Sequence, residues 1–159
     1  MNHSIKVGFS FGLTSGIITT LGLLVGLYSI TNSRLIVLGG ILMIAIADAL
    51  SDAFGIHMSE ESEQKHTARQ IWQSTVTAFL FKFFFALIFA VPILVLELQP
   101  AVIASVILGM AILGVMSYYM PKAKAMRWRT VAEHLIIAVV VVAATYYLGK
   151  WVALVFGAI

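Results

Sequence analysis

Five long apolar stretches constrain this chain more than any other feature of its sequence. They run approximately over residues 8–31, 35–58, 71–96, 101–120 and 131–157. A hydrocarbon core about 30 Å thick needs about 20 predominantly apolar residues in a helix, so each stretch is long enough to cross a bilayer. The sequence therefore predicts an all-α protein with five transmembrane helices.

The composition leaves little material for anything outside the membrane. Of the 159 residues, 61% are hydrophobic and 11% are charged, against roughly 45–50% and 25% in soluble domains. The first stretch lacks the basic region and the small-residue cleavage site of a signal peptide, so we expect it to stay in the mature protein. Residues 1–159 are expected to form a single transmembrane domain.

Basic residues near the ends of the stretches predict the orientation of the chain. The opposite flank carries only Arg34 and Lys150, while seven basic residues lie at the N-terminus and in the 59–70 and 121–130 connections: Lys6, Lys65, Arg69, Lys122, Lys124, Arg127 and Arg129. Basic residues are enriched on the cytoplasmic side of membrane proteins. The N-terminus is therefore predicted to be cytoplasmic and the C-terminus outside, and the basic loops indicate topology rather than a nucleic-acid partner.

Asp48, Asp52 and Lys82 are the clear cases of ionisable residues near the middle of the apolar stretches. Such residues are costly in a bilayer unless they are paired or hydrated, so each is a candidate functional residue. Asp48 and Asp52 are one helical turn apart and share a face. Ser59 and Glu63 fall on that face if the helix continues through the polar segment 59–70, for which a loop is the alternative. This pattern is typical of a cation path from mid-membrane to the cytoplasmic side.

Carboxylate oxygens at this spacing suit hard or borderline divalent cations, and imidazole or thioether neighbours extend the range to Fe²⁺, Mn²⁺, Co²⁺ or Zn²⁺. On a helical wheel Glu60 lies beside the stripe, and Met58 is turned away by a larger angle. The predicted metal ligands are Asp48, Asp52, Met58, Glu60 and Glu63. The residues predicted to line the path are Thr14, Ser15 and Ser59.

A structural role for these charges is the alternative. At about 1.5 Å per residue, Asp48 and Lys82 lie about 15 and 16 Å from the cytoplasmic ends of their helices, so the two side chains can pair. A buried Asp48–Lys82 ion pair would fix helix packing and leave Asp52 as the single residue facing water.

Small residues and prolines predict how the helices pack and where they bend. Gly8, Gly12 and Gly16 recur every four residues and permit close contact between helices in lipid. The alternative is that this first helix lines a tight pore or a twofold interface. Pro92 is expected to kink the third helix, and Pro121 to end the fourth.

The segment ADALSDAFGIHMSEESE, residues 47–63, resembles the second-helix motif of the vacuolar iron transporter family. FGLTSGIITTLGLLVGL in the first helix and QIWQSTVTAFLFKFFFALIFAVP at the start of the third are also similar to that family. The resemblance implies a homodimer in the bilayer, with a cation path between the subunits that exchanges Fe²⁺, Mn²⁺ or related ions against protons. It implies a metal ion as substrate and no permanently bound cofactor. The membrane would be the plasma membrane in a prokaryote and a vacuolar or other organelle membrane in a eukaryote.

The chain departs from this family pattern at the acidic positions. Ser15 stands where the family has an Asp, Asp52 where it has a Met, Asp48 where it has a small residue, and Ile56 where it has a Glu. An Asp at position 52 in place of a soft Met favours harder ions such as Mn²⁺, Mg²⁺ or Ca²⁺, or protons. In place of the long cytoplasmic insert of plant-type members, only a short acidic stub is present: Glu60, Glu61, Glu63 and His66.

Two functions follow from these observations. The first is a divalent-cation transporter with carboxylates on the second helix, and the second is a non-transporting membrane scaffold or partner subunit in which Asp48 and Lys82 form a structural pair. An enzyme is not expected, because the Asp pair lacks a carboxylate partner at matching depth on another helix. No phosphate-cradling glycine loop supports ATP-driven pumping.

Overall fold

The computed structural model describes residues 3–120 and 126–157, and these residues fold into helices joined by short turns. The first span is α1 (His3–Thr31) and the second is α2 (Arg34–Met43), η1 (Ile44–Asp48) and α3 (Ala49–Ser62) in one continuous run. The third is α4 (Ala68–Ile88) with α5 (Ala90–Val95), followed by α6 (Leu98–Tyr119) and α7 (Arg127–Phe156). Within the described residues, five helices are long and apolar enough to cross a membrane, as predicted.

The polar segment 59–70 is part helix and part turn. α3 continues through Ser62, and the chain then turns at Gln64, which has a φ of 53°. α4 starts after Thr67, whose hydroxyl accepts from the Gln70 N–H while the Gln70 side chain accepts from the Thr67 N–H. This reciprocal cap satisfies two backbone donors that the first turn of a helix leaves free. The helix therefore continues only through Ser62, and the rest of the segment before α4 is the turn that the alternative expected.

The third span is interrupted close to the predicted proline kink. The regular helix stops at Phe89, whose N–H bonds to the Ala86 carbonyl, and it resumes at Ala90. Pro92 has no N–H and its ring clashes with the carbonyl four residues earlier, which accounts for a break at this point. Pro121, Lys122 and Lys124 lie outside the described residues.

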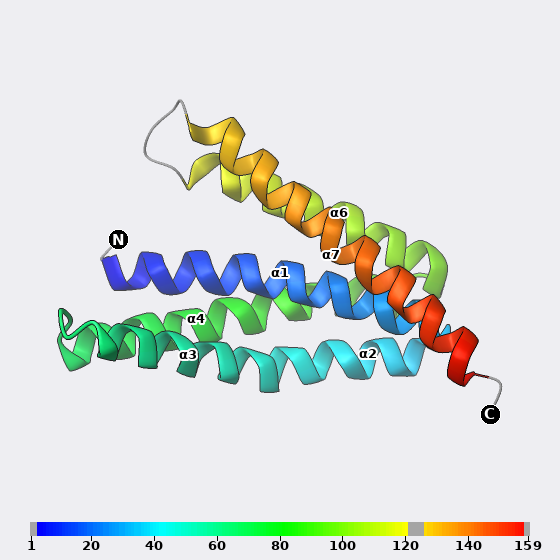
Figure 1. The fold of residues 1–159 in the computed structure, drawn as a ribbon, viewed down its shortest axis with the longest axis horizontal. Coiled ribbons are helices and arrows are strands. Elements are labelled where there is room, and N and C mark those ends of the chain that lie inside the picture. Colours follow the sequence, from blue (N-terminus) through cyan, green and yellow to red (C-terminus); the bar gives the residue numbers. More distant parts are fainter. Residues whose placement is uncertain (1–2, 121–125, 158–159) are drawn as a thin grey trace.

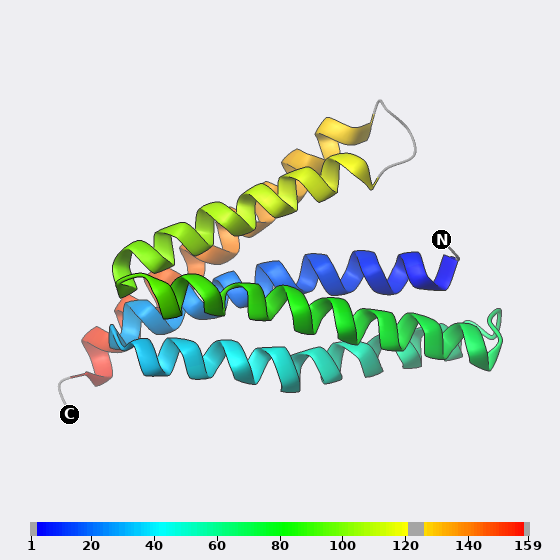
Figure 2. The same cartoon turned by 180° about the vertical axis from the view of Figure 1, so that it is seen from behind.

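Helix α1 is the centre of the bundle. Figures 1 and 2 show α1 beside α4 and the α2–α3 helix, while the α6–α7 hairpin crosses the C-terminal half of α1 and leans away from its N-terminal half. The N-terminus and the α3–α4 turn lie at one end of the molecule, and the C-terminus lies at the other (Figure 1). Which end faces the cytoplasm stays a prediction from the basic residues.

A seam of small residues brings α1 and α4 into backbone contact. A Cβ added to Gly8 would lie 2.3 Å from the Ser74 carbonyl oxygen, one on Gly12 would lie 2.4 Å from that of Ala78, and one on Gly16 would lie 3.1 Å from that of Lys82. The predicted close helix contact at these glycines is confirmed. Their partner is α4 of the same chain, with a constant register between the two parallel helices.

Substitution of Gly12 by alanine should therefore destabilise the protein by about 1–3 kcal/mol, the usual cost of overpacking. Gly39→Ala is the matched control, because a Cβ at Gly39 meets nothing within 4 Å and alanine favours a helix by up to about 1 kcal/mol. Thermal unfolding in detergent micelles measures both. Equal effects of the two substitutions would show that the seam is not tightly packed.

Candidate cation site

Lys82 lies at the middle of the third span and is completely covered by the chain. Its ammonium donates hydrogen bonds to Asp52 Oδ2 and to Ser15 Oγ at 3.0 Å, and its Nζ lies 2.5 Å from Asp48 Oδ2. Ser15 Oγ in turn donates to Asp52 Oδ2 at 2.6 Å. These four residues come from three different spans and form a cluster of charged and polar side chains, called here the Lys82 cluster.

The two acids of the Lys82 cluster sit on a locally altered helix. Residues Ile44–Asp48 form a π-helical turn, in which the N–H of Ala49 bonds to the carbonyl of Ile44. Such single turns inside α-helices are frequent at functional sites. Asp48 ends this turn and Asp52 follows one helical turn later, so both carboxylates reach the same ammonium. The prediction that they share a face is confirmed.

Coverage by protein differs across the cluster. The chain leaves 36% of the Asp48 side chain and 25% of the Asp52 side chain uncovered, but only 1% of the Lys82 side chain. The lysine therefore approaches from the protein interior, and the carboxylates form the outer boundary of the cluster. With both carboxylates ionised, one ammonium leaves one negative charge uncompensated.

The structural alternative needs correction at this point. It expected Asp48 alone to pair with Lys82 and Asp52 to remain the single residue facing water. Asp52 instead makes an ion pair with Lys82 and also accepts a hydrogen bond from Ser15, and Asp48 Oδ2 lies 2.5 Å from the same ammonium. Both acids therefore pair with Lys82, and the expectation of a free Asp52 is wrong.

Thr14 and Ser15 line a groove of about 790 Å³ along the N-terminal half of α1, with Met120 and His134 on its other side. The Thr14 hydroxyl donates to the Ser10 carbonyl of its own helix. Ser15 belongs both to this groove and to the Lys82 cluster, so the two features meet at this residue. A path-lining role for Thr14 and Ser15 stays a prediction, and Ser59 lies near the end of α3, away from this groove.

The remaining predicted ligands are near the end of α3, far from the Lys82 cluster. Glu60 is buried, and its Oε2 lies 3.7 Å from His66 Nε2, while Glu63 Oε2 lies 3.9 Å from the same nitrogen. Met58 is 63% exposed. The eight residues between Asp52 and Glu60 correspond to about 12 Å along a helix.

The predicted ligands therefore do not form one coordination sphere within a chain. Across residues 3–120 and 126–157, no three His, Asp or Glu side chains come together closely enough to hold a metal ion. The acids instead form two separate groups, the pair Asp48 and Asp52 at mid-span and the pair Glu60 and Glu63 at the end of the second span.

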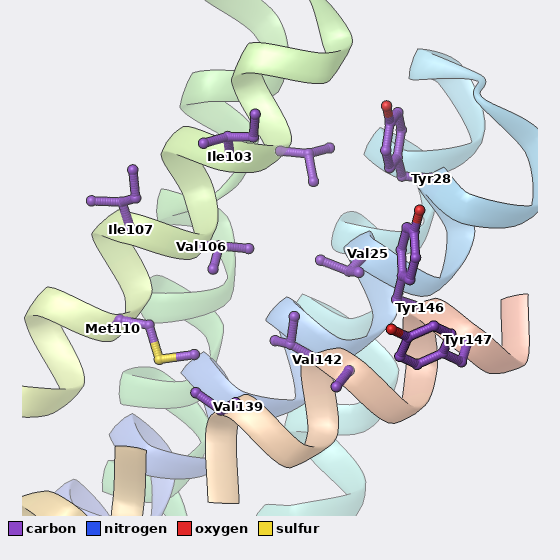
Figure 3. A pocket seen from close by; sticks show the side chains of 12 residues that line it. Val25, Tyr28, Ile103, Val106, Ile107, Met110, Val139, Val142, Tyr146 and Tyr147 are labelled. Carbon is purple, nitrogen blue, oxygen red and sulfur yellow. The ribbon is translucent and has the colours of Figure 1, made fainter. Parts of the chain in front are cut away.

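A second groove, of about 550 Å³, lies between α6, α7 and the C-terminal half of α1 (Figure 3). Aliphatic side chains such as Val106, Ile107 and Met110 line it, together with Tyr28, Tyr146 and Tyr147. None of its lining residues carries a charge. This groove therefore lacks the ligands that a metal cation needs.

Sequence reasoning missed the contact of Ser15 with Asp52 and Lys82. The signal that could have found it is the glycine spacing, because a seam that places Gly16 on the backbone of Lys82 also places the neighbouring Ser15 beside that residue. A pattern within one helix does not say which other helix it contacts. The partner of the seam was therefore not predictable from α1 alone.

Comparison with known proteins identifies the family. The VIT family model matches residues 56–150, which is more than half of the chain. The chain belongs to the VIT family. This confirms the resemblance to the vacuolar iron transporters. No curated protein matches the chain.

Membership in the VIT family makes this protein an integral membrane protein of a metal-ion transporter family and not of an enzyme family. The matched residues include Lys82, Glu60 and Glu63, whereas Ser15, Asp48 and Asp52 precede them. Two of the residues at which the sequence analysis expects a departure from the family pattern are in contact, because Ser15 Oγ donates to Asp52 Oδ2.

Proposed function

We propose that this VIT-family protein moves a divalent metal cation across its membrane, with Asp48 and Asp52 as the intramembrane ligands. The observation that carries the proposal is the pair of partly uncovered carboxylates at mid-span, which meet at one point in a chain of a metal-transporter family. Ionisable groups at this depth are rare and mark ion pathways. Glu60 and Glu63, with Met58 nearby, would collect the ion at the end of the path.

The ligand chemistry favours hard ions as the substrate. Two carboxylates and a serine hydroxyl supply oxygen only, which suits Mn²⁺, Mg²⁺ or Ca²⁺ better than softer metals. We therefore expect Mn²⁺ to be carried better than Fe²⁺. Proton exchange belongs to the proposal, because the resemblance to the vacuolar iron transporters implies it.

A homodimer is part of the same proposal. The carboxylates and the groove along α1 are open on the single chain, and polar groups open to lipid are unfavourable. A second copy across this face would enclose a path between the two subunits. The N-terminus would be cytoplasmic, in the plasma membrane of a prokaryote or an organelle membrane of a eukaryote.

The second candidate function is a non-transporting scaffold or partner subunit. The complete burial of Lys82 and its contacts with both acids favour it, because a buried ion network can serve only to fix helix packing. With both acids ionised, one carboxylate of the Lys82 cluster is uncompensated, and this favours transport instead, since such groups inside a bilayer mark ion pathways.

Cation flux into proteoliposomes loaded with a divalent-sensitive dye separates the two functions. We expect the wild type to carry Mn²⁺ above Fe²⁺, Zn²⁺ and Ca²⁺ across a pH gradient, and the triple variant Asp48→Asn, Asp52→Asn, Lys82→Met to carry none. The triple variant removes all three charges together and so leaves no ion unpaired in the bilayer. Glu133→Gln, an exposed carboxylate on α7, should transport normally. Absence of flux for every ion from folded wild-type protein would favour the scaffold.

A further inference from the structure

We propose that the Lys82 ammonium is a tethered cation of the transport site, which competes with the metal substrate for the oxygens of Asp48 and Asp52. A metal ion would bind both carboxylates only after the ammonium has moved back from them. The inference rests on the proposed function for the nature of its substrate. Its test measures binding rather than flux.

The contacts place the ammonium where a shared metal ion would lie. The same nitrogen touches Oδ2 of both acids, so an ion that bridges these oxygens would need its position. Two cations within a few ångströms of each other repel strongly in a medium of low dielectric constant. Lys82 and a bridging metal therefore exclude each other.

The charges of the Lys82 cluster suit a divalent ion better than they suit the lysine. With both acids ionised, the ammonium leaves a net charge of one negative unit, whereas a divalent cation neutralises the pair. Uncompensated charge in the bilayer interior is unfavourable. A structural ion pair with Lys82 accounts for only one of the two acids.

The surroundings let Lys82 retreat without losing its partners. Ser15 Oγ on α1 already accepts a hydrogen bond from the ammonium at 3.0 Å. Gly16 leaves room for the lysine stem, because a Cβ there would lie 3.4 Å from Lys82 Cγ. The chain leaves the carboxylates partly uncovered and the lysine covered, so an incoming ion would meet the acids first.

Lys82→Met tests this inference by removing the charge and keeping a stem of similar length. The affinity for Mn²⁺ and for Ca²⁺ would be measured from the rise in unfolding temperature of the purified protein as each ion is added at constant ionic strength. These two ions are chosen because the thioether of the new methionine is a poor ligand for hard ions. We expect the variant to bind both ions about tenfold tighter than the wild type, because the repelling charge is gone. Lys82→Arg keeps the charge and should show no gain in affinity for either ion. The neutral triple variant should bind neither ion.

Several outcomes would overturn the inference. An unchanged Mn²⁺ affinity in Lys82→Met would do so, as would a gain shared by Lys82→Arg or by the triple variant. If Lys82→Met is unfolded without metal, Mn²⁺ should restore its folded state, and failure to do so shows a purely structural lysine. If the wild type transports Mn²⁺ but Lys82→Met shows no gain in Mn²⁺ affinity, the inference about Lys82 is wrong and the proposed transport stands. If Lys82→Met gains Mn²⁺ affinity but the wild type transports no ion, the proposed transport is wrong and the competition between Lys82 and the metal stands.

Discussion

Asparagine at both positions 48 and 52, with Lys82 kept, should destabilise the protein by about 3–5 kcal/mol, the usual cost of leaving a buried charge without its partner. The Lys82 side chain is 99% covered, and its remaining polar contact would be the Ser15 hydroxyl. A serine oxygen cannot neutralise an ammonium in the middle of a span. Unfolding in mixed micelles, titrated with a denaturing detergent, measures the loss.

The triple variant with Lys82→Met provides the matched control for this loss. It should recover most of the stability of the double variant, because replacing all members of a buried ion network by neutral groups is often neutral or stabilising. Glu133→Gln should have little effect, since the Arg129–Glu133 pair is at the surface. A double variant as stable as the wild type would mean that water reaches the ammonium from within the bundle.

The fold was largely predictable because the bilayer fixes the length of its helices. Five apolar stretches became five spans, and the break near Pro92 followed from proline geometry. The ends of the helices were less predictable, since α1 starts at His3 rather than near residue 8. Hydrophobicity does not define the end of a helix that continues through polar residues. The cap at Thr67 fixes the end of the turn between α3 and α4.

The site was predictable in depth but not in connectivity. Counting residues from the helix ends placed Asp48 and Lys82 at one level, and the structure pairs them. The same count could not show that Asp52 and Ser15 complete the group, because this depends on the rotation of each helix about its axis. For α1 and α4, that rotation is set by the glycine seam between them, where the backbones touch. The separation of Glu60 and Glu63 from the two aspartates follows from the length of α3.

The seam also explains how the charges depend on packing. Gly16 touches the backbone of Lys82, and the adjacent Ser15 bonds its ammonium. A shift between α1 and α4 would therefore move the lysine relative to Asp48 and Asp52. Gly12→Ala should disturb cation binding as well as stability for this reason, whereas Gly39→Ala should not.

Single substitutions of Asp48 or Asp52 by asparagine should each reduce divalent flux by about tenfold or more, and by similar factors. Even partners that only orient a metal ligand are worth roughly 10–100-fold in affinity or activity, and we propose both residues as direct ligands. Each single variant keeps one carboxylate for Lys82, so both should fold, as unfolding in micelles can verify. Flux in proteoliposomes, with Glu133→Gln as the control, measures the effect. Loss confined to Asp52→Asn would make Asp48 the structural partner of Lys82 and leave Asp52 as the single intramembrane ligand of the chain.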